Sequence, residues 1–412
     1  MPTARPPIAS SAAPSTALVA LLAALTAIGP FSLQVLAPAL PAIATDLSVS
    51  ASAAQLVLSS SLVAMALATL VWGPLSDRFG RRPVMIAAMA LAVLGSVLGA
   101  LAPGLGLAVA GRALQAGGAI AGMVVARAIA QDVWGREGAA GAIGQITAAM
   151  VVAPMLAPVV SGTLVEASGW RAIFWLTAGL AALLVLLAAV RLHETAPAPA
   201  RAATRLSATL VDTGHAFAEL GRDRAFWAHA GYGIASLSAF LFFVGAAPFV
   251  MEEAFGIGAR GYGLWFVGVA GAYMASNLAC GRVTARLGSE RALRLGAGIA
   301  LLGIVLGLSL ALSGVAHPAA VIAPVMVQSI GAGLSVPNAL AGATAAVPGR
   351  AGAASGLMGS AQFATAGLAT QVAGALPHGD AVALMGGMGA MLAAGLALNL
   401  GLGRRAHPVS AE

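Results

Sequence analysis

Long apolar stretches separated by short polar or charged clusters run along the whole chain. Each stretch has about 20 residues, the length that an α-helix needs to cross the hydrocarbon core of a bilayer. Twelve such stretches occur, at about 18–42, 53–75, 84–103, 105–128, 139–165, 170–190, 225–251, 261–284, 292–313, 320–343, 353–376 and 381–403. Glycine and proline lie inside them, as is common in membrane helices. The pattern predicts an all-α membrane protein with twelve transmembrane helices.

The composition excludes ordinary soluble domains. Of the 412 residues, 59% are hydrophobic and 8% are charged, whereas a soluble surface needs far more charge. The net charge of +7 comes from arginines between the stretches, so it indicates membrane topology and no nucleic-acid partner. The single cysteine, Cys280, excludes a disulfide framework and a cysteine-based centre. We expect no metal and no cofactor.

The arginines also predict the orientation of the chain. All of them except three lie at the termini or in the loops that share a side with the termini. Arg171 and Arg260 lie in loops on the other side, and Arg112 alone lies inside a predicted span. Because short cytoplasmic loops are enriched in basic residues, both termini are predicted to be cytoplasmic.

One long connection, rich in Ala, Pro and Arg, divides six spans from six. The predicted organisation is a cytoplasmic leader (1–17), an N-terminal half (18–190), a cytoplasmic central loop (191–224), a C-terminal half (225–403) and a cytoplasmic tail (404–412). A repeat crosses the central loop, because Gly73, Arg78 and Gly80 recur as Gly281, Arg286 and Gly288 at an offset of 208 residues. Two parallel six-helix halves around a central site are typical of secondary transporters.

The segment GPLSDRFGRRP at 73–83 resembles the signature between the second and third helices of the major facilitator superfamily. Glycines there allow a tight reversal, and the arginines suit a cytoplasmic surface. The resemblance implies a conformational switch, in which Asp77 braces the two halves in the outward-facing state near the start of span 353–376. The residues of this switch are Gly73, Asp77, Arg78, Gly80 and Arg81. The structural alternative is a plain basic reversal loop.

The segment GRALQAGGAIAG at 111–122 resembles the buried-arginine motif of the same superfamily, with Arg112 and Gln115 one turn apart. An arginine within hydrocarbon costs roughly 2.5–3.5 kcal/mol, so it usually faces a cavity or a partner. Arg112 is also close enough to the end of its span to extend to the membrane surface. Arg112 is therefore interpreted either as a substrate contact or as a side chain that extends to the membrane surface.

The fifth span resembles the antiporter signature of the superfamily, with small residues in place of three glycines. Its members are Gly144, Ala153, Ala157, Pro158, Ser161 and Gly162. An ordinary small-residue packing face is the alternative. Together with GWRAIFW at 169–175 and the segment 247–266, the chain resembles the bicyclomycin/chloramphenicol-resistance (Bcr/CflA) branch of twelve-helix drug:proton antiporters over about 18–403. The resemblance implies a location in the bacterial inner membrane.

The end of the first span departs from this branch. It reads LQVLAP at 33–38, so Gln34 stands where the resemblance implies an aspartate, and no predicted span supplies another acid at mid-depth. Gln34 and Arg112 are expected at one depth, about 10–12 Å from the periplasmic ends of their spans. Because glutamine cannot neutralise arginine, the cavity is expected to stay positive and to disfavour organic cations.

More than half of the aromatic residues lie within 226–273. Phe240 is the predicted aromatic wall of the substrate site, although lipid exposure and core packing are alternatives. Gln328, equivalent to Gln115 in the repeat, and Gln362 are the predicted polar groups of the C-terminal half. Three residues near span ends are predicted to lie in an interfacial belt: Trp227, Tyr262 and Trp265.

The candidate proton sites are His229, one turn inside its span, and Asp132, just past the end of the fourth span. A histidine that is hydrogen-bonded at a helix start and an exposed surface acid are the structural alternatives. We therefore expect proton coupling to be weak or absent.

These patterns favour an alternating-access exporter of small amphipathic drugs or metabolites, neutral or anionic, acting as a monomer in contact with lipid. Protons are a candidate co-substrate. An uncoupled metabolite facilitator of the same fold is the alternative. An intramembrane enzyme is disfavoured because no hydrolase or metalloprotease motif occurs, and a channel because no ring of charge occurs.

Overall fold

The computed structural model describes residues 16–196, 206–347, 350–376 and 380–406, and within these ranges all regular secondary structure is helical. Most of the predicted leader and the end of the tail lie outside the described residues. The N-terminal half contains α1 (Thr16–Leu36), the 3-10 turn η1 (Ala37–Ala39), α2 (Leu40–Asp46), α3 (Ala51–Phe79), α4 (Arg81–Ala100), α5 (Leu105–Ala119), α6 (Ala121–Ser168) and α7 (Arg171–Arg191). After α9 (Leu206–Arg222), the C-terminal half contains α10 (Arg224–Phe255), α11 (Ala259–Leu287), α12 (Ser289–Leu312), α13 (Ala319–Ala345), α14 (Ala351–Gly374) and α15 (Ala381–Ala406).

Each predicted span corresponds to helical structure. The fourth and fifth spans share α6, which breaks at Gly135, where φ is 67° and ψ is 175°. Ten segments of the described chain are long and apolar enough to cross a membrane. The fifth predicted span corresponds to the second part of α6, with a shorter apolar helix at Val152–Ser168, and the eleventh corresponds to α14. The predicted all-α membrane fold is confirmed.

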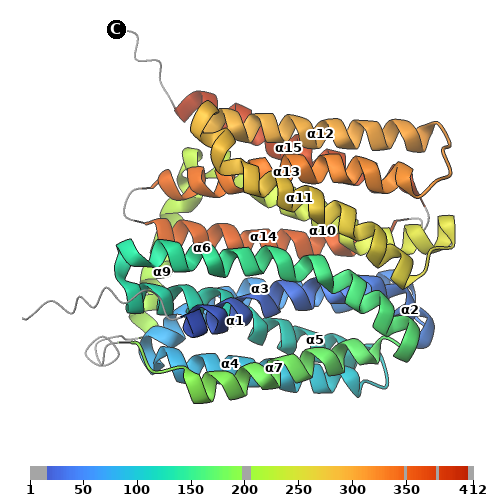
Figure 1. Ribbon diagram of the computed structural model, residues 1–412. Coiled ribbons are helices and arrows are strands. Elements are labelled where there is room, and N and C mark those ends of the chain that lie inside the picture. Colours follow the sequence, from blue (N-terminus) through green and yellow to red (C-terminus); the bar gives the residue numbers. More distant parts are fainter. Residues whose placement is uncertain (1–15, 197–205, 348–349, 377–379, 407–412) are drawn as a thin grey trace, which may run out of the picture.

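Figure 1 shows the helices side by side in one bundle, with α1–α7 in the lower part and α10–α15 in the upper part. One end of the bundle carries α9, the start of α1 and the end of α15. We call it the linker end, and the opposite end the far end. The central stretch 191–224, predicted as a loop, thus contains a helix of 17 residues.

The two halves repeat the same close helix contacts. A Cβ atom added to Gly95 in α4 would collide with the backbone amide of Gln115 in α5. A Cβ atom added to Gly303 in α12 would lie 2.6 Å from the backbone amide of Gln328 in α13. In both halves a glycine therefore brings two backbones together at the glutamine of the following helix. Gln115 and Gln328 occupy equivalent places in the repeat.

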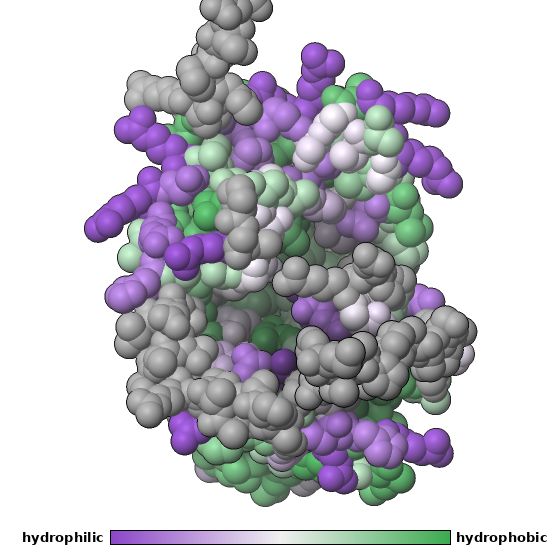
Figure 2. Space-filling view, turned by 90° about the vertical axis from the view of Figure 1, so that its left-hand side faces the viewer, coloured by the Kyte–Doolittle hydropathy of each residue, from purple (hydrophilic) through white to green (hydrophobic). Residues whose placement is uncertain are grey.

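Hydrogen bonds between the halves gather toward the far end. Gln371 in α14 donates through Nε2 to the carbonyl of Ser52 in α3 at 3.0 Å, and its Oε1 accepts from Ser59 Oγ at 3.0 Å. Ser360 Oγ donates to the carbonyl of Ala66, near the middle of α3, at 2.9 Å. Within the described residues, the hydrogen bonds that join α3 to α14 thus involve only the stretch of α3 from Ser52 to Ala66. On the linker end, Figure 2 shows a hollow between the halves with apolar surface in its depth.

Candidate functional site

Arg112 lies inside the N-terminal half, and only 1% of it is exposed. Its guanidinium donates to Oε1 of Gln115, one turn later in α5, and to the backbone carbonyl of Ser32 in α1. Gln115 in turn donates through Nε2 to Thr177 Oγ1 in α7 at 2.5 Å. Three helices therefore hold this side chain in place. It is enclosed by the bundle and does not extend to the outer surface.

The positive charge of Arg112 has no carboxylate partner among the described residues. Its Nε atom is buried, and no described residue accepts a hydrogen bond from it. Gln34 lies two residues after Ser32, is 6% exposed, and its Oε1 atom also lacks a described partner. A buried polar atom without a partner costs about 1–3 kcal/mol. One donor on α5 and one acceptor on α1 are therefore unsatisfied among the described residues.

The predicted polar residues of the C-terminal half lie on two different helices. Gln328 in α13 is fully buried, and its Nε2 atom has no described partner. Gln362 in α14 donates through Nε2 to the carbonyl of Gly233 in α10 at 3.0 Å. None of the hydrogen bonds described for these two residues reaches Arg112. The structure brings Gln115 to Arg112 but does not bring Gln328 or Gln362 into direct contact with it.

Aromatic side chains from both halves pack against one central apolar cluster. Phe31 of α1, Phe240 of α10 and Phe363 of α14 are half-buried beside this cluster, which contains residues of both halves. The ring centroid of Phe240 lies 6.3 Å from that of Phe266 in α11. Phe240 thus contributes apolar surface where the halves meet.

The interfacial position predicted for Tyr262 is wrong. Only 1% of Tyr262 is exposed, and its ring centroid lies 5.9 Å from that of Phe266. Its hydroxyl is buried without a described partner. The residue is close to a span end in the sequence, but α11 packs against α6 there, so tertiary contacts cover a side chain that would otherwise meet the lipid headgroups.

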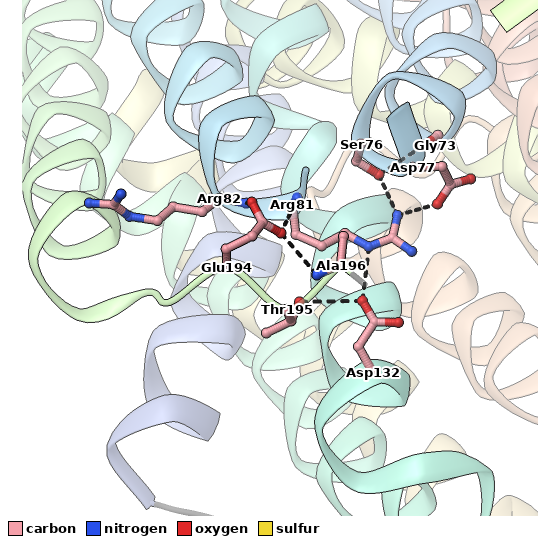
Figure 3. Close-up of polar contacts among 9 residues, drawn as sticks. All are labelled: Gly73, Ser76, Asp77, Arg81, Arg82, Asp132, Glu194, Thr195 and Ala196. Atoms are coloured by element: carbon pink, nitrogen blue, oxygen red, sulfur yellow. Dashed lines mark hydrogen bonds and ion pairs between the residues drawn. The ribbon is translucent and has the colours of Figure 1, made fainter. Parts of the chain in front are cut away.

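The predicted switch residues form a charge network at the linker end, shown in Figure 3. Arg81 at the start of α4 donates to the carboxylate of Asp77, to Ser76 Oγ at 2.7 Å and to Asp132 Oδ2 at 3.0 Å. Arg78 is exposed and lies over the ring of Phe79. The described partners of Asp77 thus belong to its own half, and none belongs to α14. The network ties the end of α3 to α4 and α6.

Glu194, which the sequence reasoning missed, completes this network (Figure 3). Its carboxylate accepts hydrogen bonds from the backbone amides of Arg81 at 2.9 Å and Arg82 at 3.3 Å. These first amides of α4 have no partner within the helix, and a carboxylate suits the positive end of a helix. Gly80 has φ of 101°, and a Cβ atom there would collide with Glu194. The available signal was a single acid directly after the sixth span, opposite a basic loop.

Pro158 and Gly162 of the fifth span lie at the interface between the halves. A Cβ atom added to Gly162 would lie 2.5 Å from the carbonyl of Ala259 in α11, and one added to Gly263 would collide with the carbonyl of Pro158. The other motif residues differ in burial: Ala157 and Ser161 are buried, Ala153 is half-buried, and Gly144 is exposed with no neighbour within 4 Å of an added Cβ atom. The motif thus allows α6 and α11 to approach closely near the far end.

Both candidate proton sites, His229 and Asp132, form hydrogen bonds with other residues of the protein. His229 Nδ1 lies 3.0 Å from the carbonyl of Ala225, and Nε2 lies 3.0 Å from Glu290 Oε2 in α12. Asp132 accepts from Arg81 and, at 3.3 Å, from Thr195 Oγ1. Neither residue has a described contact with Arg112 or Gln34.

The helix of the fourth span is longer than predicted. It continues beyond residue 128 to Gly135, so Arg127 lies eight residues before the end of this helical segment. The sequence places a boundary near Arg127 because a charge normally ends an apolar stretch. Arg127 is half-buried, and no hydrogen bond or ion pair of its side chain is found among the described residues.

Comparison with known proteins agrees with this architecture. The sequence profile of the Major Facilitator Superfamily matches residues 22–370. An uncharacterized MFS-type transporter of Bacillus subtilis, YdgK, is 34% identical over 253 residues, 61% of this chain and 62% of that protein. The chloramphenicol resistance protein of Pseudomonas aeruginosa is 30% identical over 70% of this chain and 67% of that protein. A bicyclomycin resistance protein homolog of Haemophilus influenzae is 26% identical over 90% of this chain and 92% of that protein.

A solved structure supports the fold. The D-xylose-proton symporter superposes with a TM-score of 0.74 at 16% identity, covering 94% of this chain and 96% of that chain. The sequence alignments span less than two thirds of the Bacillus subtilis protein but nearly all of the Haemophilus influenzae protein. The chain is a multi-pass membrane transporter and not an enzyme. It belongs to the major facilitator superfamily, within the drug:proton antiporter branch that includes the bicyclomycin and chloramphenicol resistance proteins.

Proposed function

We propose that the protein exports small amphipathic molecules, neutral or anionic, across the bacterial inner membrane by alternating access to a site between its halves. The linker end is the cytoplasmic end, with both termini there, because it carries most of the arginines. The resistance proteins named above support a role in drug or metabolite export. A monomer surrounded by lipid is sufficient for this activity.

The charge of Arg112 is the observation that carries the proposed substrate class. The guanidinium is buried between α1 and α5 with neutral partners only. At an effective dielectric constant of about 20, a substrate cation about 6 Å away would be disfavoured by about 3 kcal/mol, or about 100-fold in binding. A carboxylate or sulfonate would gain a charge-assisted hydrogen bond instead.

Matched dyes test this proposal in proteoliposomes. Three naphthalene dyes share one aromatic scaffold and carry a sulfonate, no charge or a trimethylammonium group. Saturable transport of the first two, with at least tenfold slower transport of the third, is expected. Preferential transport of the cationic dye would contradict the proposal.

A facilitator without proton coupling is the second candidate. It is favoured by Gln34 at the place of the expected aspartate and by the engagement of His229 with Glu290. Under this alternative a pH gradient leaves the final dye distribution unchanged, whereas a coupled exporter concentrates the dye.

A further inference from the structure

The first part of α6 has two different faces. Val125, Ala126, Ile129 and Ala130 are buried in an apolar cluster with residues of α1 and α4. Met123, Val124, Arg127 and Ala128 are half-buried and form one continuous stripe, because residues three and four apart share a helix face. Arg127 therefore lies on the side of α6 that faces away from α1 and α4.

The neighbours of this stripe show where it points. Met123, one turn before Arg127, packs against the central cluster that contains residues of both halves. Val124 lies 3.8 Å from the position of a Cβ atom added to Gly73 in α3. The stripe thus faces α3, the helix that is hydrogen-bonded to α14 of the other half. Figure 2 shows a hollow between the halves on the linker end.

The guanidinium of Arg127 has no carboxylate partner in the described part of the chain. The nearby acids are engaged elsewhere, since Asp77 and Asp132 pair with Arg81, and Glu194 accepts from backbone amides of α4. Within the described residues, no carboxylate lies within ion-pair distance of Arg127. An arginine inside a span that lacks a protein partner needs water or a ligand group.

We propose that Arg127 is the first binding site for the acidic group of an amphipathic organic anion, such as an aromatic carboxylate or sulfonate, that enters the hollow from the linker end. Arg127 lies about 12 Å inside that end and about 20 Å from Arg112 along the helix axis. A guanidinium binds such oxygens bidentately, while apolar surface in the hollow receives the remainder of the molecule. Gln115 and Gln328 are 213 residues apart, and the same offset places Leu340 opposite Arg127, so the C-terminal half has no charge at this position. This inference rests on the proposed export of anions.

Cysteine accessibility tests the position of Arg127 without any substrate. The chain has one cysteine, so a Cys280→Ser background carries Arg127→Cys, with Ala126→Cys on the buried face and Leu186→Cys on an exposed face of α7 as controls. In inverted vesicles, a membrane-impermeant sulfonated methanethiosulfonate should modify only the Arg127→Cys variant. Equal lack of reaction in all three variants would overturn the inference.

Binding of matched dyes tests the chemistry. Energy transfer from tryptophan to 8-anilinonaphthalene-1-sulfonate and to neutral N-phenyl-1-naphthylamine reports dye that lies close to the protein in nanodiscs, and the change between wild type and variant reports the site. Arg127→Gln should raise the dissociation constant of the sulfonate dye about tenfold, with partial recovery in Arg127→Lys and less than a twofold change for the neutral dye. Unchanged binding of the sulfonate dye, or equal losses for both dyes, would overturn the inference.

Transport of the same dyes by wild-type proteoliposomes separates the two proposals. If the wild type binds the sulfonate dye through Arg127 but transports neither dye, the proposed export function fails and this binding site stands. If both dyes are transported and Arg127→Gln changes nothing, the binding site fails and export stands.

Discussion

The Gln34→Asp substitution restores the carboxylate that the family resemblance implies beside Arg112. Arg112 has an Nε–H group without a partner among the described residues, and its guanidinium donates to the backbone carbonyl of Ser32, two residues before Gln34. We expect this variant to couple transport to a pH gradient more strongly than the wild type does. Gln34→Asn is the matched control, since asparagine has the size of aspartate but no charge.

The size of the effect can be taken from Coulomb's law. A carboxylate about 5 Å from the guanidinium gains about 3 kcal/mol at an effective dielectric constant of about 20. An interaction of this size can keep the carboxylate deprotonated in one conformation. The carboxylate can then take up a proton in another conformation, if its distance from the guanidinium increases during transport. Exchange of one proton per substrate converts each pH unit into about 1.4 kcal/mol, or about tenfold accumulation.

The assay imposes a gradient of one pH unit on proteoliposomes and follows the sulfonate dye to its final distribution. Gln34→Asp should approach tenfold accumulation of the dye. The wild type and Gln34→Asn should stay near the dye distribution that is reached without a pH gradient. Equal accumulation by Gln34→Asp and Gln34→Asn would refute the reasoning. Strong accumulation by the wild type that persists in a His229→Ala variant would also refute it, and would exclude the histidine as the proton carrier.

Three other substitutions test separate parts of the structure. Arg112→Ala should abolish dye transport while the protein still purifies as a monodisperse species, and near-normal flux would show that its buried charge is dispensable. Asp77→Asn should lower turnover at least threefold with less than a twofold change in the dissociation constant, because Asp77 lies at the linker end; a reversed pattern would contradict its switch role. Glu194→Gln should destabilise the protein by about 1–3 kcal/mol, seen as a lower thermal midpoint, because two backbone amides of α4 lose a charged acceptor. An unchanged midpoint would show that the Glu194 contacts contribute little.

The close contact between α4 and α5 shows how much of the candidate site the sequence predicts. Arg112 and Gln115 are three residues apart on a helix, so their contact follows from local geometry. The repeat offset then located Gln328, and Gly95 and Gly303 occupy matching places. The contacts of Gln328 and Gln362 could not be predicted from the sequence, because they depend on which helix packs against each side chain. Gln362 uses its amide on the backbone of Gly233, a contact that no spacing rule indicates.

The sequence by itself determined the spans, the two halves and the family, because hydrophobic length, arginine distribution and short motifs are local properties of the chain. Only the tertiary structure decided which charges are neutralised. Glu194 and Arg81 are far apart in sequence and meet because α7 ends beside the start of α4. Arg127 looked like a span boundary, and Tyr262 looked interfacial, because a sequence shows the polarity of a residue but not its surroundings. A membrane helix can carry a charge where a neighbouring hollow admits water, and it can bury an aromatic residue where another helix excludes lipid. Both conditions depend on the packing of distant segments.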